Sequence, residues 1–108
     1  MSYNFQVSDG HFNLTARNGK VILTSEEYKT KTGIRRGIDS VIRNAGLDSA
    51  YSRLIARDGR YYFTLRAGNN KVIGTSQMYR YRISREIGIM SVKWNAANVI
   101  PFINYTMV

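Results

Sequence analysis

The sequence contains no cysteine and only one histidine, His11. Without cysteine the chain has no disulfide, no thiolate nucleophile and no cysteine-ligated zinc, and a single histidine excludes a metal site built from several histidines. No run approaches the roughly 20 apolar residues that a membrane span needs, and the N-terminal residues resemble no signal peptide. We therefore expect a cytoplasmic protein with no metal, cofactor or membrane partner.

Acidic residues are also scarce, with 7 Asp and Glu against 16 Lys and Arg, a net charge of +9. Asp9 and Asp58 belong to Asp-Gly turns, and Glu86 lies where a helix should begin. No pair of carboxylates recurs, and none of the common phosphate-binding or nucleophile motifs is present. We expect a binding protein rather than an enzyme, and the excess positive charge favours an acidic partner.

The most informative feature that is present is an internal repeat. A shift of 51 residues aligns residues 12–45 with 63–96 without a gap, and 16 of the 34 positions are identical. The shared pattern is F-x-L-x-A-x-N-x-K-V-I-x-T-S-x-x-Y, then eight residues, then G-I-x-S-V-x-x-N-A. We predict one domain over residues 1–108, made of repeat 1 (residues 1–48) and repeat 2 (residues 49–108).

Each repeat begins with alternating apolar residues, which predict strands separated by tight turns. In repeat 1, Asp9-Gly10 is typical of a type I′ hairpin turn. If each turn has two residues, Val7 faces Phe12, Phe5 faces Leu14 and Ala16 faces Val21. The same reasoning in repeat 2 predicts that Leu54 and Ala56 face Phe63 and Tyr61, and that Ala67 faces Val72.

After the third strand the apolar period changes to that of a helix. Ile34, Ile38, Val41, Ile42 and Ala45 form one stripe, and Ile89, Val92 and Ala96 form its counterpart, flanked by Ile87 and Met90. Ser84 is the expected N-cap of the second helix. Gly37 and Gly88, in the middle of the two helices, suggest that each helix lies close to the sheet. The predicted fold is α+β: two β-β-β-α repeats around a pseudo-two-fold axis, with six to eight antiparallel strands and both helices on one face.

These residues resemble the repeat of the YegP-like family, small bacterial and archaeal proteins bearing a domain of unknown function. The resemblance covers Phe12–Ala45 and Phe63–Ala96, and the segment 75–79 is close to that family's typical sequence. It implies tandem β-β-β-α-β units that share a sheet and exchange their last strands, here residues 50–57 and 98–107. It implies no activity and no catalytic residue.

The segments Thr24-Ser25-x-x-Tyr28 and Thr75-Ser76-x-x-Tyr79 form a polar turn that recurs in both repeats. Such a hydroxyl-rich turn could bind an anion or a small polar ligand. The alternative is structural, with the hydroxyls satisfying backbone groups at the strand end while the tyrosine covers the sheet. Because the turn occurs twice, we favour the structural interpretation.

Positive charge is concentrated in repeat 2, where residues 49–108 hold 9 basic and 2 acidic residues. The candidate polyanion-binding residues are Arg80, Tyr81, Arg82 and Arg85, because arginine forks contact phosphates and tyrosines stack on bases. The alternative is a solvated loop that keeps the protein soluble. Our leading hypothesis is a non-enzymatic module that binds nucleic acid or an acidic protein.

The C-terminal segment from Val99 to Tyr105 is too apolar to remain in water. We expect either a strand that closes the sheet or a partner surface, with Pro101 at an edge or a bulge. The second hypothesis is therefore a protein–protein module that forms a homodimer through residues 98–107 by edge-strand pairing. An uncharacterised enzyme is the third.

Overall fold

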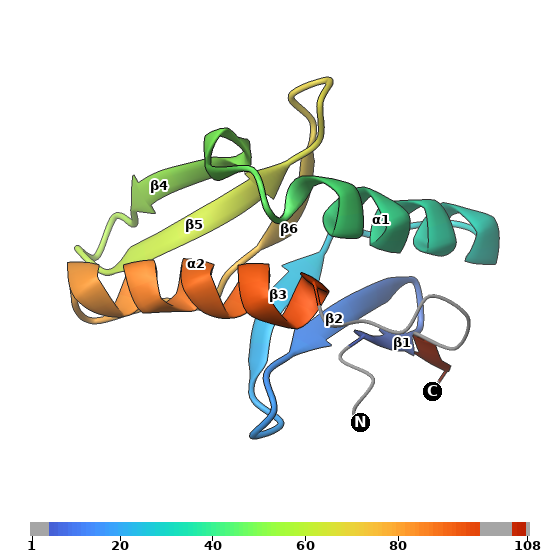
Figure 1. The fold of residues 1–108 in the computed structure, drawn as a ribbon, viewed down its shortest axis with the longest axis horizontal. Helices are drawn as coiled ribbons and strands as arrows, with labels where there is room; N and C mark the ends of the chain where they lie inside the picture. Colours follow the sequence, from blue (N-terminus) through green and yellow to red (C-terminus); the bar gives the residue numbers. More distant parts are fainter. Residues whose placement is uncertain (1–4, 98–104, 108) are drawn as a thin grey trace.

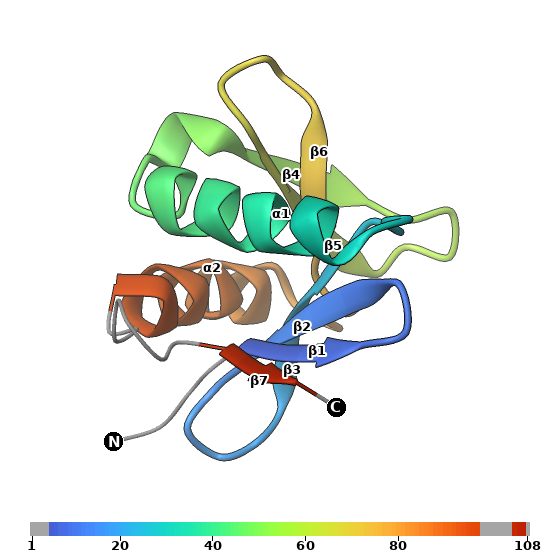
Figure 2. The same cartoon turned by 90° about the vertical axis from the view of Figure 1, so that its right-hand side faces the viewer.

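The computed structural model describes residues 5–97 and 105–107, and their elements run β-β-β-α twice before a final strand. In Figure 1 the two helices are staggered and meet near their C-terminal ends, and Figure 2 shows both on the same face of one sheet. The elements are β1 (Phe5–Ser8), β2 (His11–Thr15), β3 (Val21–Ser25), α1 (Lys31–Asn44), the 3-10 helix η1 (Asp48–Ala50), β4 (Tyr51–Ile55), β5 (Tyr61–Arg66), β6 (Val72–Thr75), α2 (Arg82–Ala97) and β7 (Tyr105–Met107). The predicted α+β repeat fold is confirmed.

The two repeats meet where β3 pairs antiparallel with β6, in a sheet ordered β4-β5-β6-β3-β2-β1-β7. Thr24 lies opposite Thr75, its own counterpart after a shift of 51 residues. A residue that pairs with its own counterpart marks a local two-fold axis. A half-turn about the line of sight in Figure 1 accordingly exchanges α1 with α2 and the β5–β6 turn with the β2–β3 turn.

The strand that follows each helix joins the opposite half of the sheet. After α1 the chain enters β4, which pairs with β5, and after α2 it enters β7, which pairs with β1. The implied strand exchange is thus made by β7, while β4 is at the same time the first strand of repeat 2. One detail of the prediction was wrong, because β7 is parallel to β1 while the other six strands are antiparallel. The rest of the apolar segment, residues 98–104, lies outside the described residues.

The turns differ from the two-residue hairpins that we expected. Val7 faces Phe12 and Phe5 faces Leu14 as predicted, but of residues 9 and 10 only Gly10 has a positive φ, 74°, so the turn is not type I′. The loops of the other three hairpins are one residue longer. The last residue of each loop has a φ between 70° and 87°, and these residues are Gly19, Gly59 and Asn70. A left-handed residue after a tight turn gives a bulge that matches the strand twist.

The extra residue moves the pairing by one position and corrects four predicted pairs. Val21 lies opposite Thr15 rather than Ala16, and Val72 lies opposite Arg66 rather than Ala67. In β4, Leu54 lies opposite Tyr62 rather than Phe63, which faces Arg53. Likewise Tyr61 lies opposite Ile55 rather than Ala56. Since a shift of one residue turns every side chain to the other face of a sheet, Arg53 lies on the helix side of β4 and Leu54 does not.

The predicted helix stripes form the core, with Ile38, Val41, Ile89 and Val92 almost fully buried. Helix α1 begins after Thr30, whose Oγ1 accepts a hydrogen bond from the Gly33 N–H at 2.9 Å. The expected N-cap role of Ser84 was wrong, because α2 already begins at Arg82.

An aromatic triad closes each half of the core. Phe5 meets Phe12 edge-on at 5.8 Å, and Phe12 stacks on Tyr28 at 6.2 Å. The same arrangement recurs as Tyr51, Phe63 and Tyr79, with ring separations of 5.7 and 6.4 Å. Phe5 and Tyr51 are thus structural counterparts, although the longer turn of repeat 2 hides this from an ungapped alignment.

The glycine of each helix lies against the tyrosine of its triad. A Cβ on Gly37 would lie 2.5 Å from the Tyr28 hydroxyl, and a Cβ on Gly88 would lie 2.7 Å from Cζ of Tyr79. The close approach that the glycines suggested is therefore confirmed, and the ring that requires it belongs to the segment after the third strand of the same repeat.

The two-fold axis also explains a difference between the repeats. Gly74 is the counterpart of Leu23, and a Cβ on Gly74 would lie 2.7 Å from Cγ of Leu23. Both positions face the same space across the axis, and the fully buried Leu23 occupies it. Only one large side chain fits there.

This shared space gives a prediction for stability. Gly74→Leu should cost about 1–3 kcal/mol by overpacking, and Leu23→Ala should cost about 2–5 kcal/mol by leaving a cavity. The double variant Leu23→Ala/Gly74→Leu moves the side chain to the other side of the axis. Its free energy of unfolding should therefore be roughly 1–3 kcal/mol higher than the sum of the two single costs predicts. Urea denaturation measures all three, and strictly additive costs would contradict a shared space.

Candidate nucleic-acid interface

The structure brings two arginine-rich segments of repeat 2 together. Tyr61 and Tyr79 form an isolated antiparallel bridge, with hydrogen bonds of 2.8 and 2.7 Å between their backbones. This bridge holds the β4–β5 turn beside the beginning of α2, as seen at the left of Figure 1. Arg57 and Arg60 of the turn thereby join Arg80 and Arg82.

We call Arg57, Arg60, Arg80, Tyr81 and Arg82 the arginine surface, and all five side chains are exposed. The Arg80 guanidinium lies 5.4 Å from the ring centre of Tyr81, and that of Arg82 lies 5.7 Å from the ring centre of Tyr61. Arg60 contacts Asp58 at 2.8 Å. Sequence reasoning missed Arg57 and Arg60, because they lie about 20 residues before Arg80 and only the bridge unites them.

Arg85, the remaining candidate, is placed differently. Its side chain is buried, its Nη1 donates to the Leu54 carbonyl at 3.1 Å, and its Nε donates to Glu86 at 3.2 Å. The guanidinium also lies 5.3 Å from the ring centre of Tyr61. Because these contacts hold Arg85 inside the protein, we leave it out of the arginine surface.

Arg85 belongs to a charged network that connects η1, β4 and α2. Arg53 donates from Nε to both oxygens of Glu86, at 2.9 and 3.0 Å, and from Nη2 to Asp48 at 3.1 Å. Lys93 adds a second contact to Asp48 at 3.2 Å. The counterparts in repeat 1 are largely apolar, since Val7 and Ile34 stand where repeat 2 has Arg53 and Arg85.

The network lowers the pKa of both of its carboxyls. Partial burial alone would raise the pKa of Glu86, but the hydrogen bonds from Arg53 and Arg85 outweigh it and lower that pKa below 4.5. Hydrogen bonds from Arg53 and Lys93 likewise lower the pKa of Asp48. The pKa of Arg53 rises, chiefly through its hydrogen bond to Glu86.

The recurring polar turn is occupied by structural contacts. Ser25 Oγ accepts from the Phe12 N–H at 2.9 Å and donates to the Glu26 carbonyl at 2.8 Å. Ser76 makes the same two bonds, with Phe63 and Gln77. These bonds tie the end of the third strand to the start of the Phe-bearing strand.

The two threonines lie within the strands β3 and β6. Thr24 donates to Asn13 Oδ1 at 2.9 Å, and Thr24 pairs with Thr75 at the centre of the sheet. Tyr28 and Tyr79 stack in the aromatic triads. We therefore do not include these six residues in the candidate interface.

An apolar stripe runs along the exposed side of α2. Its four side chains are 60–66% exposed, and they are Ile83, Ile87, Met90 and Trp94. Their spacing of four, three and four residues places them on one side of the helix. The counterparts in α1 are Thr32, Arg36, Asp39 and Arg43, so the stripe belongs to repeat 2 alone. The sequence indicated Ile87 and Met90 as flanking residues but not that they would be exposed.

Within the described part of the chain, no helix is long and apolar enough to span a membrane. In the same residues, no three His, Cys, Asp or Glu side chains gather where they could hold a metal ion. His11 lies in the first hairpin, where its Nδ1 is 3.1 Å from the Asp9 carbonyl oxygen.

A family model described as a domain of unknown function (DUF1508) matches the sequence twice, over residues 9–51 and 56–99. A UPF0339 protein of Acinetobacter baylyi is 49% identical over 92 residues, with 83% of each chain covered. The UPF0339 protein YegP of Escherichia coli is 46% identical over 93 residues, with 84% of each chain covered. These names carry no activity.

Two solved structures are similar to this one. The solution structure of YegP from E. coli, described as a protein of unknown function, superimposes with a TM-score of 0.83 at 41% identity, covering 95% of this chain and 88% of that one. A UPF0339 protein of Shewanella oneidensis gives a TM-score of 0.87 at 38% identity, covering 99% and 92%. The similarity therefore extends over nearly the whole fold.

The charged network predicts how stability responds to acid. Because the pKa of Glu86 is lowered on folding, its pairing stabilises the protein above pH 4.5, and this contribution is lost as the pH falls through the folded-state pKa. Glu86→Gln should be less stable at neutral pH, since Arg85 stays buried without its carboxylate, and its stability should fall less on acidification.

Urea denaturation at about pH 7 and about pH 3 measures this difference. Glu26→Gln is the matched control, because Glu26 is an exposed carboxylate outside the network. An equal acid-induced loss of stability in wild type and Glu86→Gln would contradict the prediction.

Proposed function

The chain belongs to the DUF1508 family, to which no activity is attached, and we propose from its own geometry that it is a binding module for single-stranded nucleic acid. The observation that carries this proposal is the arginine surface, in which the Tyr61–Tyr79 bridge brings two arginine-bearing segments together and one of them carries the exposed Tyr81. The proposed ligand contacts repeat 2, and the chain performs no chemistry on it. The cytoplasmic location expected from the sequence stays a prediction.

The charge balance of repeat 2 supports a polyanion. Residues 49–108 contain two carboxylates, and both are already paired: Asp58 with Arg60, and Glu86 with Arg53 and Arg85. Arg57, Arg80 and Arg82 form no ion pair with a described residue. Their charge is therefore available to phosphates, whose contact releases condensed counterions.

The exposed ring of Tyr81 favours a single strand over a duplex. Its side chain is 57% exposed and lies between Arg80 and Arg82 in the sequence. A base that has left its helix can stack on such a ring, while neighbouring guanidinium groups contact the phosphates on both sides. A duplex keeps its bases stacked and offers the ring no partner.

The repeat supplies a matched test of the charge contribution. Arg80→Gln/Arg82→Gln should flatten the slope of log K against log salt by about 1.4 for a single strand, since each phosphate contact contributes about 0.7. Lys29→Gln/Lys31→Gln removes the same charge from the counterpart positions of repeat 1 and should leave the slope nearly unchanged. Fluorescence anisotropy with a labelled oligonucleotide at several salt concentrations measures both variants.

Tyr81→Ala should weaken single-strand binding by about 1–3 kcal/mol with little change in the salt slope, because it removes stacking and not charge. Absence of binding at low salt would contradict the proposal. Equal effects of the Arg80/Arg82 and the Lys29/Lys31 variants would also contradict it, because net charge alone would then explain the affinity.

The second candidate function is self-association, and the specific observation behind it is the apolar stripe on α2. Exposed apolar patches of this kind mark interaction sites. We propose a second copy as the occupant, because a two-fold dimer buries one stripe against the same stripe and needs no other surface. Pairing along β7, the edge strand formed by residues 105–107, is the second route and continues the homodimer expected through residues 98–107.

The stripe predicts an oligomeric state that depends on α2. Ile87→Glu/Trp94→Glu should shift a dimer to monomer, because each carboxylate would be buried without a partner in the dimer. The control Arg36→Glu/Arg43→Glu changes the counterpart residues of α1 and should leave the dimer intact. Analytical ultracentrifugation distinguishes the states, and a wild-type monomer at all concentrations would contradict both routes.

A further inference from the structure

Two pockets lie at opposite edges of the helix face, and they are counterparts in the internal repeat. The larger, of 630 Å³, lies between α1 and the β5–β6 turn, and the smaller, of 270 Å³, lies between α2 and the β2–β3 turn. All nine lining residues of the smaller pocket have their counterparts, 51 residues away, in the larger. Each pocket combines a helix of one repeat with a turn of the other, so it exists only in the assembled fold.

Seven of these nine pairs are identical, including the polar pairs Asn18/Asn69, Lys20/Lys71, Tyr28/Tyr79 and Ser40/Ser91. Folding explains part of this identity. Asn69 Oδ1 accepts from the Lys71 backbone N–H at 3.0 Å, and Asn18 does the same with Lys20, so the asparagines shape the turns. The exposed ammonium groups of Lys20 and Lys71 form no hydrogen bond or ion pair with a described residue. Core packing and turn geometry do not account for them.

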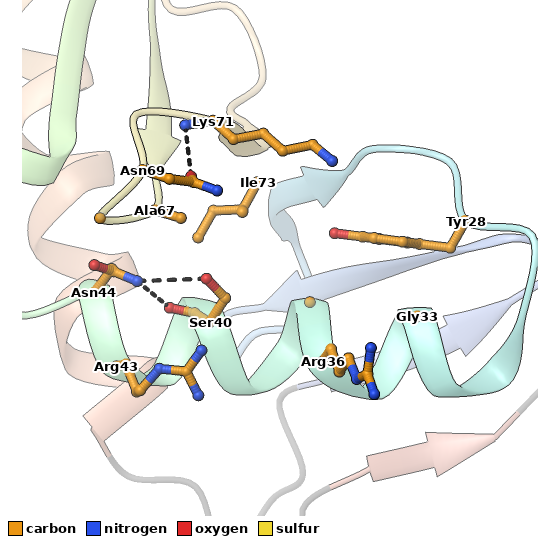
Figure 3. A pocket seen from close by; sticks show the side chains of 12 residues that line it. Tyr28, Gly33, Arg36, Ser40, Arg43, Asn44, Ala67, Asn69, Lys71 and Ile73 are labelled. Atoms are coloured by element: carbon orange, nitrogen blue, oxygen red, sulfur yellow. Dashed lines mark hydrogen bonds between the residues drawn. The ribbon is translucent and has the colours of Figure 1, made fainter.

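Figure 3 shows how the larger pocket is built. Ser40 and Asn44 point from α1 toward the turn, and Asn44 Nδ2 donates to the Ser40 carbonyl at 2.8 Å. Lys71, just before β6, and the Tyr28 ring, in the segment after β3, extend over the same space. Ile73 forms an apolar wall of the pocket. Burial, and secondarily the nearby Glu26, raise the pKa of Tyr28, so its hydroxyl remains a hydrogen-bond donor at neutral pH.

The two pockets differ in charge. Arg36 and Arg43 line the larger pocket from α1 and Lys71 lines it from the turn, and no carboxylate is among its lining residues. In the smaller pocket Ile87 replaces Arg36, and Lys20 is the single cation among the residues that line it. Three cations that line one pocket together with hydroxyl and amide donors are suited to an oxyanion, because arginine and lysine are the side chains that bind phosphate.

We propose that the larger pocket binds a small organic phosphate ester, with its phosphate at Lys71, Arg36 and Arg43 and its organic part against Ile73 and Ala67. The volume of 630 Å³ lies within the roughly 300–1,000 Å³ that small-molecule sites occupy. This site is separate from the arginine surface, which lies at the beginning of α2, and it does not rest on the proposed nucleic-acid function.

Amide NMR titration of the full chain with three probes tests the proposal: inorganic phosphate, ribose 5-phosphate and adenosine monophosphate. The esters should shift the amide signals of Asn69, Asn70 and Lys71 and the side-chain amide of Asn44. Tighter binding of ribose 5-phosphate would indicate that the pocket accepts the sugar alone. Tighter binding of adenosine monophosphate would indicate that it accepts a base as well. Inorganic phosphate binding as tightly as both esters would overturn the assignment of an organic ligand.

The repeat again supplies the control variant. Lys71→Gln should weaken ester binding by about tenfold or more, which corresponds to the roughly 1.4 kcal/mol of a charge-assisted hydrogen bond. Lys20→Gln removes the same charge at the counterpart position and should change the affinity less than about twofold, within the weak effect of net charge at a distance. Equal losses in the two variants would overturn the proposal.

A gain-of-function variant covers the case in which Lys71→Gln disturbs the turn. Ile87→Arg gives the smaller pocket the cation that Arg36 provides in the larger one. It should add ester-dependent shifts at the amides of Asn18, Gly19 and Lys20, which the wild type should lack. Shifts of these amides in the wild type as large as those of Asn69 and Lys71 would contradict the charge-based distinction between the pockets.

Discussion

The pairing of β3 with β6 is the interaction on which the rest of the structure depends. It joins two three-stranded halves of about 50 residues, and a sheet of that size with one apolar face buries too little surface to be stable alone. The pairing also fixes the two-fold axis between Thr24 and Thr75. Once the axis is set, Leu23 fills the space that Gly74 leaves open, and a single side chain serves both halves of the core.

The same axis determines where binding surfaces can arise. Each helix packs over the shared sheet beside a turn from the other repeat, which creates the two related pockets. Two groups stand out among the residues that the repeats share. Phe12, Leu14, Ile38 and their counterparts build the core, and Lys71 with its counterpart Lys20 lines the pockets without a role in packing.

Residues that differ between the repeats give the two halves distinct surfaces. Repeat 2 replaces apolar contacts of repeat 1 by the network of Arg53, Arg85 and Glu86, which satisfies a buried guanidinium with a carbonyl and a carboxylate. Glu86 is paired within that network and Asp58 is paired with Arg60, so no carboxylate among the described residues of repeat 2 pairs with Arg57, Arg80 or Arg82. The exposed side of α1 carries arginines, and that of α2 carries the apolar stripe. The proposed phosphate-ester pocket and the candidate dimer contact therefore lie on different helices.

The sequence by itself determined the repeat, the order of the elements, the helix stripes and the close approach at Gly37 and Gly88. These follow from local periodicity and from identity between residues 51 positions apart, which a linear pattern can show. It also singled out Arg80, Tyr81 and Arg82 as candidate binding residues, because they are adjacent in the chain, and their role stays a prediction. The family resemblance added the exchange of the last strands.

Only the tertiary structure decided the features that depend on distant residues meeting. The bulged turns moved Arg53 to the helix side of β4, and its partner Glu86 lies 33 residues away. The Tyr61–Tyr79 bridge joined Arg57 and Arg60 to the arginine surface and left Arg85 buried beneath it. The pockets likewise combine residues that are distant in the sequence. The register of the central pairing is set by side chains that meet across the two-fold axis. No local pattern therefore specifies which turn will lie beside which helix.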